Sequence, residues 1–289
     1  MELTRLLRLF SYGADVKAAK DKLVELGYLS ASTHKTFGKD TQKAVKAFQT
    51  ANNLEVDGVI GPLTWAALFP AEKDDIQVQA ATVVPAHIGT DAARLIGIDL
   101  AQVSELRRNL CLEALNHATD PAKHGTLRSF YIRGGNLYNK DLSVNRMTKS
   151  KLVSYFGKSS YAPYYDGGRK EMMLAHAEES GYTQTGADCS GGVVGLWRLF
   201  KVYSTGFDAT ANQLYNNYCT KTDKPRPGDL AWKSGHIGMY VGGGYIVEWA
   251  GGAYGCQLTK ANNRRVYNYV TKKTQKLGGW TAYGDPKKY

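Results

Sequence analysis

One cysteine of this chain stands where a thiol could act as a nucleophile. Cys189 lies in the run Gly-Ala-Asp-Cys-Ser-Gly-Gly over residues 186–192, directly before an apolar segment that ends at Phe200. The segment predicts a buried helix that begins near Cys189. A thiol attacks only as the thiolate, which a helix N-terminus and a neighbouring imidazole both favour. The run therefore predicts a cysteine nucleophile; a buried structural cysteine is the alternative.

A histidine downstream offers the imidazole. His236 opens a β-rich run that ends at Val241, three glycines follow, and a second run begins at Tyr245. Two such runs around a glycine loop predict a hairpin. If all three glycines form the loop, Val241 pairs with Tyr245. Glu248 then lies opposite Gly238, on the face that carries His236.

Gly238 would leave the space between His236 and Glu248 open. The placement depends on the loop, because two or four loop residues would turn Glu248 to the other face. An exposed hairpin with a solvated glutamate is the alternative. Nucleophile, base and orienting acceptor are the parts that a cysteine hydrolase requires.

Several segments together resemble the NlpC-type cell-wall cysteine peptidases, which have a reduced papain-like fold. The matching runs are Tyr-Ile-Arg-Gly-Gly (131–135), Asp-Cys-Ser-Gly (188–191), Pro-Gly-Asp-Leu (227–230) and His-Ile-Gly-Met-Tyr (236–240). Gly-Trp-Thr over 279–281 is similar to the closing strand of phage members. The resemblance implies that Cys189 is the nucleophile, His236 the general base and acid, and Glu248 the residue that orients the imidazole. The family most often has histidine at this third position, so Glu248 departs from its pattern.

The resemblance also implies a substrate. The thiol would attack an amide carbonyl in the stem peptide of bacterial peptidoglycan, most typically the γ-D-glutamyl to diamino acid bond. Asp188 and Ser190 would hold the free amine and backbone of the stem peptide, and Tyr131 would add a hydroxyl to the same site. Three alternatives stay open: an N-acetylmuramoyl-L-alanine amidase with the same mechanism, a wall-binding protein with an inactive hydrolase domain, and a non-hydrolytic acyl transferase.

The start of the chain resembles the small three-helix peptidoglycan-binding domain found on many wall hydrolases. Matching runs include Leu-Gly-Tyr-Leu (26–29), Phe-Gly (37–38) and Asp-Gly-Val-Ile-Gly (57–61). Residues recur at helical spacing in two stretches: Val16, Ala19, Leu23 and Leu26, then Thr41, Ala44, Val45 and Phe48. Asp40 suits the N-cap of the second helix, and Pro62 suits the first position of a third. A helical spacer that binds nothing is the alternative.

Length and composition fit two domains, since the chain has 289 residues and is 43% hydrophobic. We predict a peptidoglycan-binding-like domain over 1–70, a linker over 71–101 that contains Pro85 and Gly89, and a catalytic domain over 102–289. The expected fold class is α+β: helices packed on an antiparallel sheet, preceded by the three-helix domain. The first catalytic helix is expected to begin near Ser104.

A long spacer between the aromatic-Gly-Gly run and Cys189 departs from the resembled family. Residues 136–187 are rich in tyrosine, which offers stacking faces and hydroxyl groups. A substrate groove or lid and a structural insertion that packs beside the site both fit this composition.

Net charge and the spacing of histidines and cysteines limit which partners and cofactors we expect. The net charge of +11 and a pI near 9.3 favour anionic partners. No nucleic-acid-binding motif accompanies this charge, so we expect bacterial peptidoglycan and not nucleic acid. The histidines lack zinc-ligand spacing, and four cysteines in a chain of this length do not suggest a disulfide framework. We therefore expect no metal and no other cofactor.

Residues 1–8 are too charged for a signal peptide, and no stretch is long enough to span a membrane. We therefore expect no membrane insertion, synthesis in the host cytoplasm, and action on the cell wall after release, as in a phage endolysin. A mature form whose signal had been removed would have the same sequence.

Overall fold

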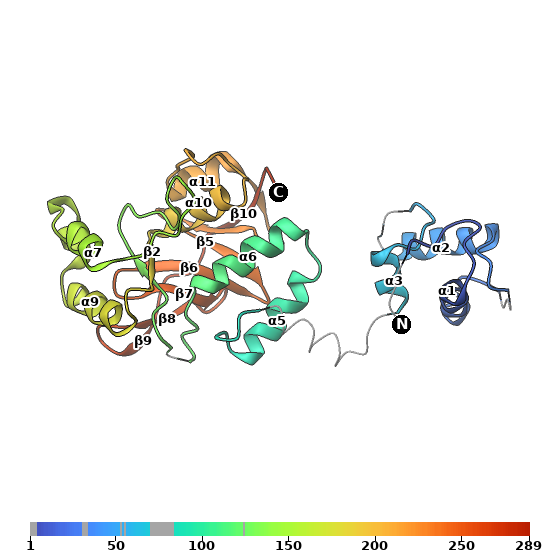
Figure 1. The fold of residues 1–289 in the computed structure, drawn as a ribbon, viewed down its shortest axis with the longest axis horizontal. Helices are drawn as coiled ribbons and strands as arrows, with labels where there is room; N and C mark the ends of the chain where they lie inside the picture. Colours follow the sequence, from blue (N-terminus) through green and yellow to red (C-terminus); the bar gives the residue numbers. More distant parts are fainter. Residues whose placement is uncertain (1–4, 31–33, 53, 55, 70–83, 124) are drawn as a thin grey trace. The chain divides into compact units, whose positions relative to one another are not determined.

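A boundary near residue 76 divides the chain into two units, residues 1–76 and 77–289, in the computed structural model (Figure 1). The structure describes residues 5–30, 34–52, 54, 56–69, 84–123 and 125–289. Within these ranges, no helix is long and apolar enough to cross a membrane.

The first unit contains the three expected helices: α1 (Ala14–Glu25), α2 (Lys39–Ala51) and α3 (Pro62–Leu68). The expected periodic residues Val16, Ala19, Leu23, Thr41, Ala44, Val45 and Phe48 are buried, as predicted. Two details were wrong. Leu26 caps the end of α1 and is 43% exposed, and Gly38 rather than Asp40 is the N-cap of α2.

The second unit is built on a six-stranded antiparallel sheet with the strand order β3-β10-β4-β5-β6-β7. Its strands are β3 (Cys219–Thr222), β4 (Leu230–Lys233), β5 (His236–Gly242), β6 (Tyr245–Gly251), β7 (Gly255–Lys260) and β10 (Ala282–Pro286). Two smaller sheets accompany it: β1 (Ser129–Tyr131) parallel to β2 (Thr185–Ala187), and β8 (Arg265–Asn268) antiparallel to β9 (Lys273–Lys276).

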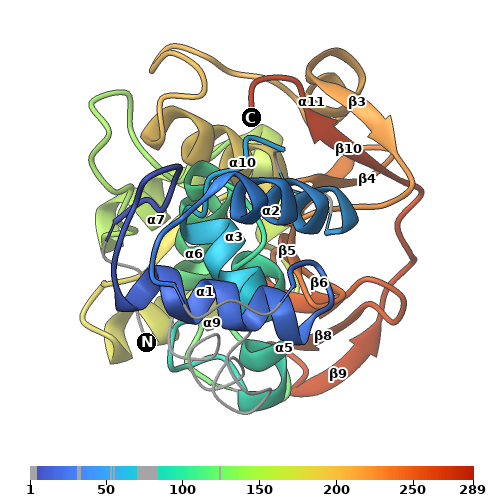
Figure 2. The ribbon, with the colours of Figure 1, turned by 90° about the vertical axis from the view of Figure 1, so that its right-hand side faces the viewer.

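Helices pack on the central strands of this sheet. They are α5 (Thr90–Leu100), α6 (Glu105–His117), α10 (Cys189–Leu199) and α11 (Ala211–Tyr218). All four contact β5; α10 also contacts β6, and α11 also contacts β3 and β4. In Figure 2 the strands β4, β5 and β6 lie on one side of the unit and α6 and α10 on the other. The α+β class, with helices on an antiparallel sheet, is therefore confirmed.

The predicted linker is wrong over its second half. Residues 71–83 lie outside the described residues, but Val84 is already buried, and α5 follows within the predicted linker. Ile96 and Leu100 of α5 are fully buried in the core of the second unit. The reason is that Gly89 is not part of a linker, as its residue type indicated. It is the N-cap of α5. The next helix, α6, begins at the expected place, because the Ser104 side chain accepts a hydrogen bond from the Arg107 amide.

The spacer between residues 136 and 187 folds into short helices with a core of their own. They are α7 (Lys149–Phe156), η1 (Ser159–Tyr161), α8 (Ala162–Tyr165) and α9 (Arg169–Glu179). Met147, Leu152 and Tyr165 are buried against Phe130 and Ile132 of the β1 segment. This insertion therefore packs beside the segment that leads into the candidate site.

Candidate active site

Cys189 is the first residue of α10. Strand β2 ends at Ala187, and Asp188 is the N-cap: its carboxylate accepts a hydrogen bond from the Gly191 amide at 2.7 Å. The helix therefore begins as predicted, with the thiol at its positive end. Cys189 is 6% exposed.

Glycines let α10 approach its neighbours closely. A Cβ on Gly191 would lie 1.9 Å from the Gly135 carbonyl oxygen, and one on Gly192 would lie 2.2 Å from the Trp249 ring. Gly135 belongs to the aromatic-Gly-Gly run, so this run and the start of α10 touch backbone to backbone. These glycines therefore serve close packing, since glycine is a poor helix former.

The hairpin that carries His236 and Glu248 has a different loop from the one predicted. The loop contains two residues, Gly243 and Gly244, and Tyr245 pairs with Gly242 instead of Val241. A two-residue loop alone would turn Glu248 away from His236. A β-bulge between Tyr240 and Gly242 adds one residue to β5, and beyond it Met239 pairs with Val247. This register places Glu248 opposite Gly238, as expected.

The two side chains meet over Gly238. His236 Nε2 lies 2.8 Å from Glu248 Oε2. A Cβ on Gly238 would lie 3.1 Å from the Glu248 Cβ and 2.9 Å from the Val247 carbonyl oxygen, so glycine leaves the required space. Since Nε2 faces the carboxylate, Nδ1 remains for the thiol of Cys189.

The imidazole is held in its charged form. Burial lowers the pKa of His236, but interactions with the thiol of Cys189 and the carboxylate of Glu248 outweigh burial and raise it to about 9. The carboxylate is fully buried, and burial raises its pKa. Hydrogen bonds from Arg264 and His236 reverse that effect and hold the pKa of Glu248 well below its usual range. An imidazolium next to a thiol favours the thiolate.

Sequence reasoning missed two partners of Glu248. Arg264 donates from Nε to Glu248 Oε1 at 2.7 Å, and its terminal nitrogen Nη2 donates to Oε2. Thr259 donates its hydroxyl to Oε1 at 2.8 Å. Arg264 is itself buried and donates to the Gly278 carbonyl oxygen. No local pattern marks Arg264, because the pairing of β6 with β7 and the following turn bring it to the carboxylate.

An indole covers the imidazole. The rings of Trp280 and His236 are stacked, with centroids 5.4 Å apart, and the Arg264 guanidinium lies 4.7 Å from the Trp280 ring centroid. Trp280 belongs to the Gly-Trp-Thr run, which does not form a strand itself: β10 begins one residue after it, at Ala282. Trp280 therefore packs on the imidazole that contacts Glu248.

The structure gives the three expected substrate-binding residues different surroundings. Tyr131 lies near Cys189 and Asp188. Burial, reinforced by these two groups, raises the pKa of Tyr131 well above its usual range, so its hydroxyl keeps its proton. Asp188 is largely occupied, because Oδ1 accepts from Ser190 and Gly191 and Oδ2 accepts from the Gly134 amide. Asp188 and Ser190 therefore shape the start of α10 as well as bordering the site.

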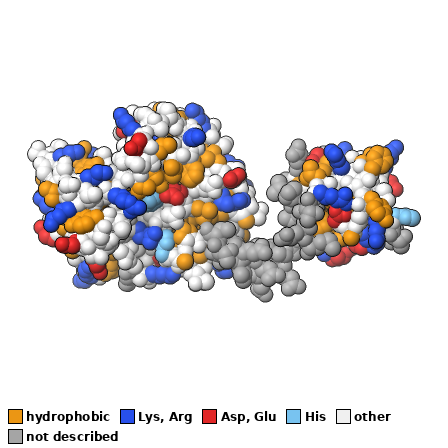
Figure 3. All heavy atoms as spheres, viewed as in Figure 1, with side chains coloured by type: hydrophobic (Ala, Val, Ile, Leu, Met, Phe, Trp, Pro, Cys, Tyr) orange, Lys and Arg blue, Asp and Glu red, His pale blue; other side chains and the backbone are white. Residues whose placement is uncertain are grey.

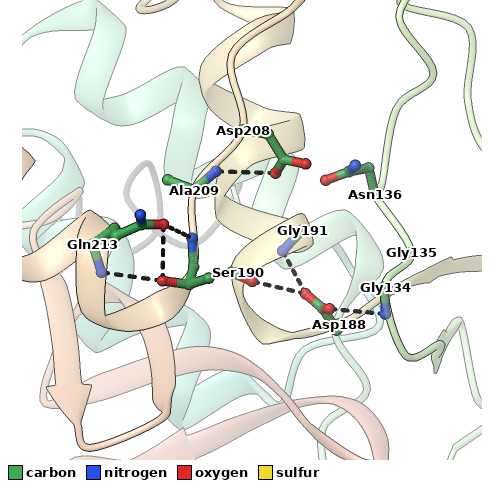
Figure 4. A pocket seen from close by; sticks show the side chains of 10 residues that line it. Gly134, Gly135, Asn136, Asp188, Ser190, Gly191, Asp208, Ala209 and Gln213 are labelled. Carbon is green, nitrogen blue, oxygen red and sulfur yellow. Dashed lines mark hydrogen bonds between the residues drawn. The ribbon is translucent and has the colours of Figure 1, made fainter. Parts of the chain in front are cut away.

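A pocket of about 340 Å³ borders the start of α10 (Figure 4). It is lined by Gly134, Gly135, Asn136, Asp188, Ser190, Gly191, Asp208, Ala209, Thr210 and Gln213. Asn136 and Asp208 point toward one another in Figure 4. Asp208 is exposed, and it accepts a hydrogen bond from the adjacent Ala209 amide. The lining of the pocket therefore includes both carboxylate and amide side chains, and two of its residues, Asp188 and Ser190, flank Cys189 in the sequence.

The other cysteines lie in different surroundings. Burial raises the pKa of Cys111, Cys219 and Cys256 above its usual range, which keeps these thiols protonated. None of the four cysteines forms a disulfide. In the described ranges, no group of three or more His, Cys, Asp or Glu side chains is placed to hold a metal ion.

Comparisons with known proteins find matches over parts of the chain. An uncharacterized protein in the bpoA1 3' region of Kitasatospora aureofaciens is 44% identical over 57 residues, which are 19% of this chain and 48% of that protein. The chain thus matches about half the length of this curated relative. A peptidoglycan-binding protein from Clostridioides difficile, crystallised with glutamine hydroxamate, is 42% identical and covers 22% of this chain and 40% of its own, with a TM-score of 0.22.

A second solved structure, the endolysin of Burkholderia phage AP3, is 21% identical, with a TM-score of 0.22. The match covers 61% of this chain and 63% of that one. Residues 12–68 match the family model described as "Putative peptidoglycan binding domain". The first unit of the chain therefore contains the segment that matches this domain family.

Proposed function

We propose that this protein is a peptidoglycan hydrolase that cleaves an amide bond of the wall stem peptide through a cysteine thiolate. The favoured bond is the γ-D-glutamyl to diamino acid bond, as in the NlpC-type cell-wall peptidases that the sequence resembles. The observation that carries the proposal is the interaction of Cys189, at the start of α10, with His236, which in turn contacts the buried carboxylate of Glu248. The peptidoglycan-binding domain supports the substrate class.

The proposed reaction has two stages. The Cys189 thiolate attacks the amide carbonyl carbon, and the resulting oxyanion accepts hydrogen bonds from the Cys189 amide and the Tyr131 hydroxyl. The imidazolium of His236 then gives its proton to the leaving nitrogen, the C–N bond breaks, and a thioester remains. Neutral His236 next takes a proton from water, which attacks the thioester. The acid product leaves and the thiolate returns.

Glu248 orients the imidazole in both stages through the 2.8 Å contact with Nε2. This contact supports an active site over an inactive wall-binding protein, because a carboxylate can accept the ring N–H in place of the family's usual histidine. The position of Trp280 supports the same reading, since the ring covers the buried pair.

The test is hydrolysis of purified peptidoglycan by Cys189→Ser and by the wild type, with mass spectrometry of the products. We expect the rate of lysis to fall by a factor of about 1,000 or more in the variant, because the serine hydroxyl does not ionise as a thiol does and is a much weaker nucleophile. Its circular dichroism should remain that of the wild type. Lysis at the wild-type rate would contradict the cysteine mechanism.

The same spectra separate the two candidate bonds. Products with a free diamino acid amine and an intact muramoyl–alanine link support the endopeptidase. Products in which the whole stem peptide has left the glycan support the amidase alternative instead. Labelling of Cys189 by iodoacetamide provides an independent measure, since an inactive domain would not show the fast, pH-dependent reaction of a thiolate.

A further inference from the structure

The peptidoglycan-binding unit exposes two aromatic side chains at its start. Phe10 is 80% exposed and Tyr12 is 66% exposed, more than any other large hydrophobic residue in the part of the chain that the structure describes. The family match begins only at residue 12, so Phe10 belongs to a segment outside it. Hydrophobic groups are visible at the surface of this unit among charged ones (Figure 3). A ring left in water is available to a ligand.

The backbone that carries these rings is ordered. Leu7 is fully buried and pairs with Ile60 through two hydrogen bonds, of 3.0 and 2.8 Å. The Phe10 amide donates to the Phe37 carbonyl oxygen at 2.9 Å, and the Phe37 amide donates to the Ser11 carbonyl oxygen at 2.8 Å. The backbone that carries the two exposed rings is therefore fixed by hydrogen bonds to the rest of the unit.

Phe10 also occupies a turn position that suits glycine or asparagine. The Ser11 amide donates to the Arg8 carbonyl oxygen at 2.8 Å, which closes a four-residue turn with Phe10 in its third position. The φ angle of Phe10 is 73°, in the left-handed region that bulky side chains rarely adopt. Because the ring is 80% exposed, little packing compensates for this strain. A strained, exposed aromatic residue points to a role in binding.

The charges around these rings suit an anionic polymer. Arg8 and Lys35 are exposed, and the Lys35 carbonyl oxygen accepts a hydrogen bond from the Gly13 amide, next to Tyr12. Ion pairs within the described part of this unit are Arg5–Asp15, Lys17–Asp21 and Lys22–Glu25. Neither Arg8 nor Lys35 takes part in these pairs. Both side chains are therefore available to carboxylates of the wall.

We propose that Phe10 and Tyr12 form the face on which this unit binds the glycan strand of peptidoglycan. Each ring stacks on the apolar face of a pyranose, and Arg8 and Lys35 attract carboxylates of the attached stem peptides. The Cα atoms of residues two apart lie within about 7 Å of each other, so the two rings extend from neighbouring points of the backbone. The assignment rests on the wall-binding part of the proposed function and is independent of the cysteine chemistry.

The test is sedimentation of the full chain with purified insoluble peptidoglycan on ice, in a Cys189→Ala background that leaves the wall intact. The double variant Phe10→Asn/Tyr12→Thr removes both rings, and asparagine tolerates the left-handed turn position. The matched control Leu26→Ala/Val56→Ala removes two side chains of the same unit that are 43% and 48% exposed. We expect the dissociation constant to rise about ten-fold or more in the first variant and to stay unchanged in the control.

Two further measurements identify the ligand and exclude a structural role. Oligomers of N-acetylglucosamine should compete with the wall for the wild type, whereas competition by free stem peptide alone would overturn the glycan assignment. The thermal midpoint of Phe10→Asn should equal or exceed that of the wild type, because the turn strain is relieved. A lower midpoint would mean that the ring stabilises the fold, and it would overturn the inference.

The outcomes also separate this inference from the proposed function. Equal sedimentation of the wild type and of the Phe10→Asn/Tyr12→Thr variant would overturn the assignment of the face and leave wall binding intact. A wild type that does not sediment at all would contradict wall binding itself and overturn both. Catalysis is read separately, as the release of soluble fragments by chains that keep Cys189.

Discussion

Glu248 behaves differently from an isolated carboxylate because Arg264 compensates its charge. Both carboxylate oxygens accept hydrogen bonds from the guanidinium, and one of them also faces His236. The guanidinium therefore keeps Glu248 ionised and holds its Oε2 toward the imidazole.

Replacement of Glu248 should lower turnover without abolishing it. We expect a roughly ten- to hundred-fold loss of kcat in Glu248→Ala and a smaller loss in Glu248→Gln, whose amide oxygen can still accept the ring N–H. Loss of the carboxylate also lowers the pKa of His236 from about 9, so the alkaline limb of the pH–rate profile should move to lower pH in both variants. Unchanged rate and profile in Glu248→Ala would make the site a Cys–His dyad.

The same substitution should destabilise the fold through Arg264. Removing one partner of a buried ion pair costs about 3–5 kcal/mol, because the other charge stays buried without compensation. We therefore expect Glu248→Gln to lower the free energy of unfolding, and Glu248→Gln/Arg264→Met to recover most of that loss. Denaturant unfolding measures both. If the double variant is as unstable as the sum of the single variants, the two side chains do not interact.

The raised pKa of His236 predicts that stability falls in alkaline solution. The imidazolium stabilises the folded state fully below its ordinary pKa of 6.5, and this contribution is lost as the pH rises through about 9. The expected loss is on the order of 3 kcal/mol, because each pKa unit between 6.5 and about 9 corresponds to about 1.4 kcal/mol. Denaturant unfolding at pH 6.5 and 9.5 measures it through tryptophan fluorescence, and His236→Asn should lose less. An equal loss in that variant would assign the pH dependence to other groups.

At the scale of elements, the site depends on how closely α10 approaches the aromatic-Gly-Gly run. Gly191→Ala would place a methyl group 1.9 Å from the Gly135 carbonyl oxygen. We expect a loss of about 1–3 kcal/mol in unfolding free energy and a lower kcat, because the start of α10 and its thiol must shift. Gly206→Ala is the matched control, since no atom lies within 4 Å of its added Cβ. Equal effects of the two variants would exclude the contact as the cause.

The sequence predicted those parts of the site that local patterns encode. The start of α10 follows from the apolar run after Asp188, whereas the predicted face of Glu248 is correct only because a bulge in β5 compensates for the shorter loop. The bulge in β5 could not be predicted, because three consecutive glycines fit either a three-residue loop or a two-residue loop with an irregular strand. Arg264 was missed for a related reason: its contact with Glu248 depends on the pairing of β6 with β7.

The extent of the second unit also depends on tertiary packing. Small residues, Pro85 and Gly89 are typical of a linker. The apolar face of α5 nevertheless packs in the core of the second unit, against β5. Asp99, near the end of α5, accepts a hydrogen bond from the Gly243 amide at 2.8 Å. Helix α5 therefore supports the turn of the hairpin that carries His236 and Glu248, which composition alone could not indicate.

At the scale of the whole molecule, the two units predict separable tasks. A fragment over residues 84–289 keeps α5 and should cleave small soluble muropeptides at about the rate of the full chain. It should act more slowly on intact walls, because it lacks the peptidoglycan-binding domain. Equal rates on intact walls would show that the first unit does not assist catalysis.

A shorter fragment over residues 104–289 tests where the second unit begins. Without α5 it loses the buried side chains of Ile96 and Leu100, each of which contributes roughly 1.5–3 kcal/mol, and the contact of Asp99 with the hairpin turn. The total approaches the stability of a typical domain, so this fragment should unfold at lower denaturant concentration and lose activity even on soluble muropeptides. If both fragments were equally stable and active, α5 would be a dispensable extension, as the original linker prediction implies.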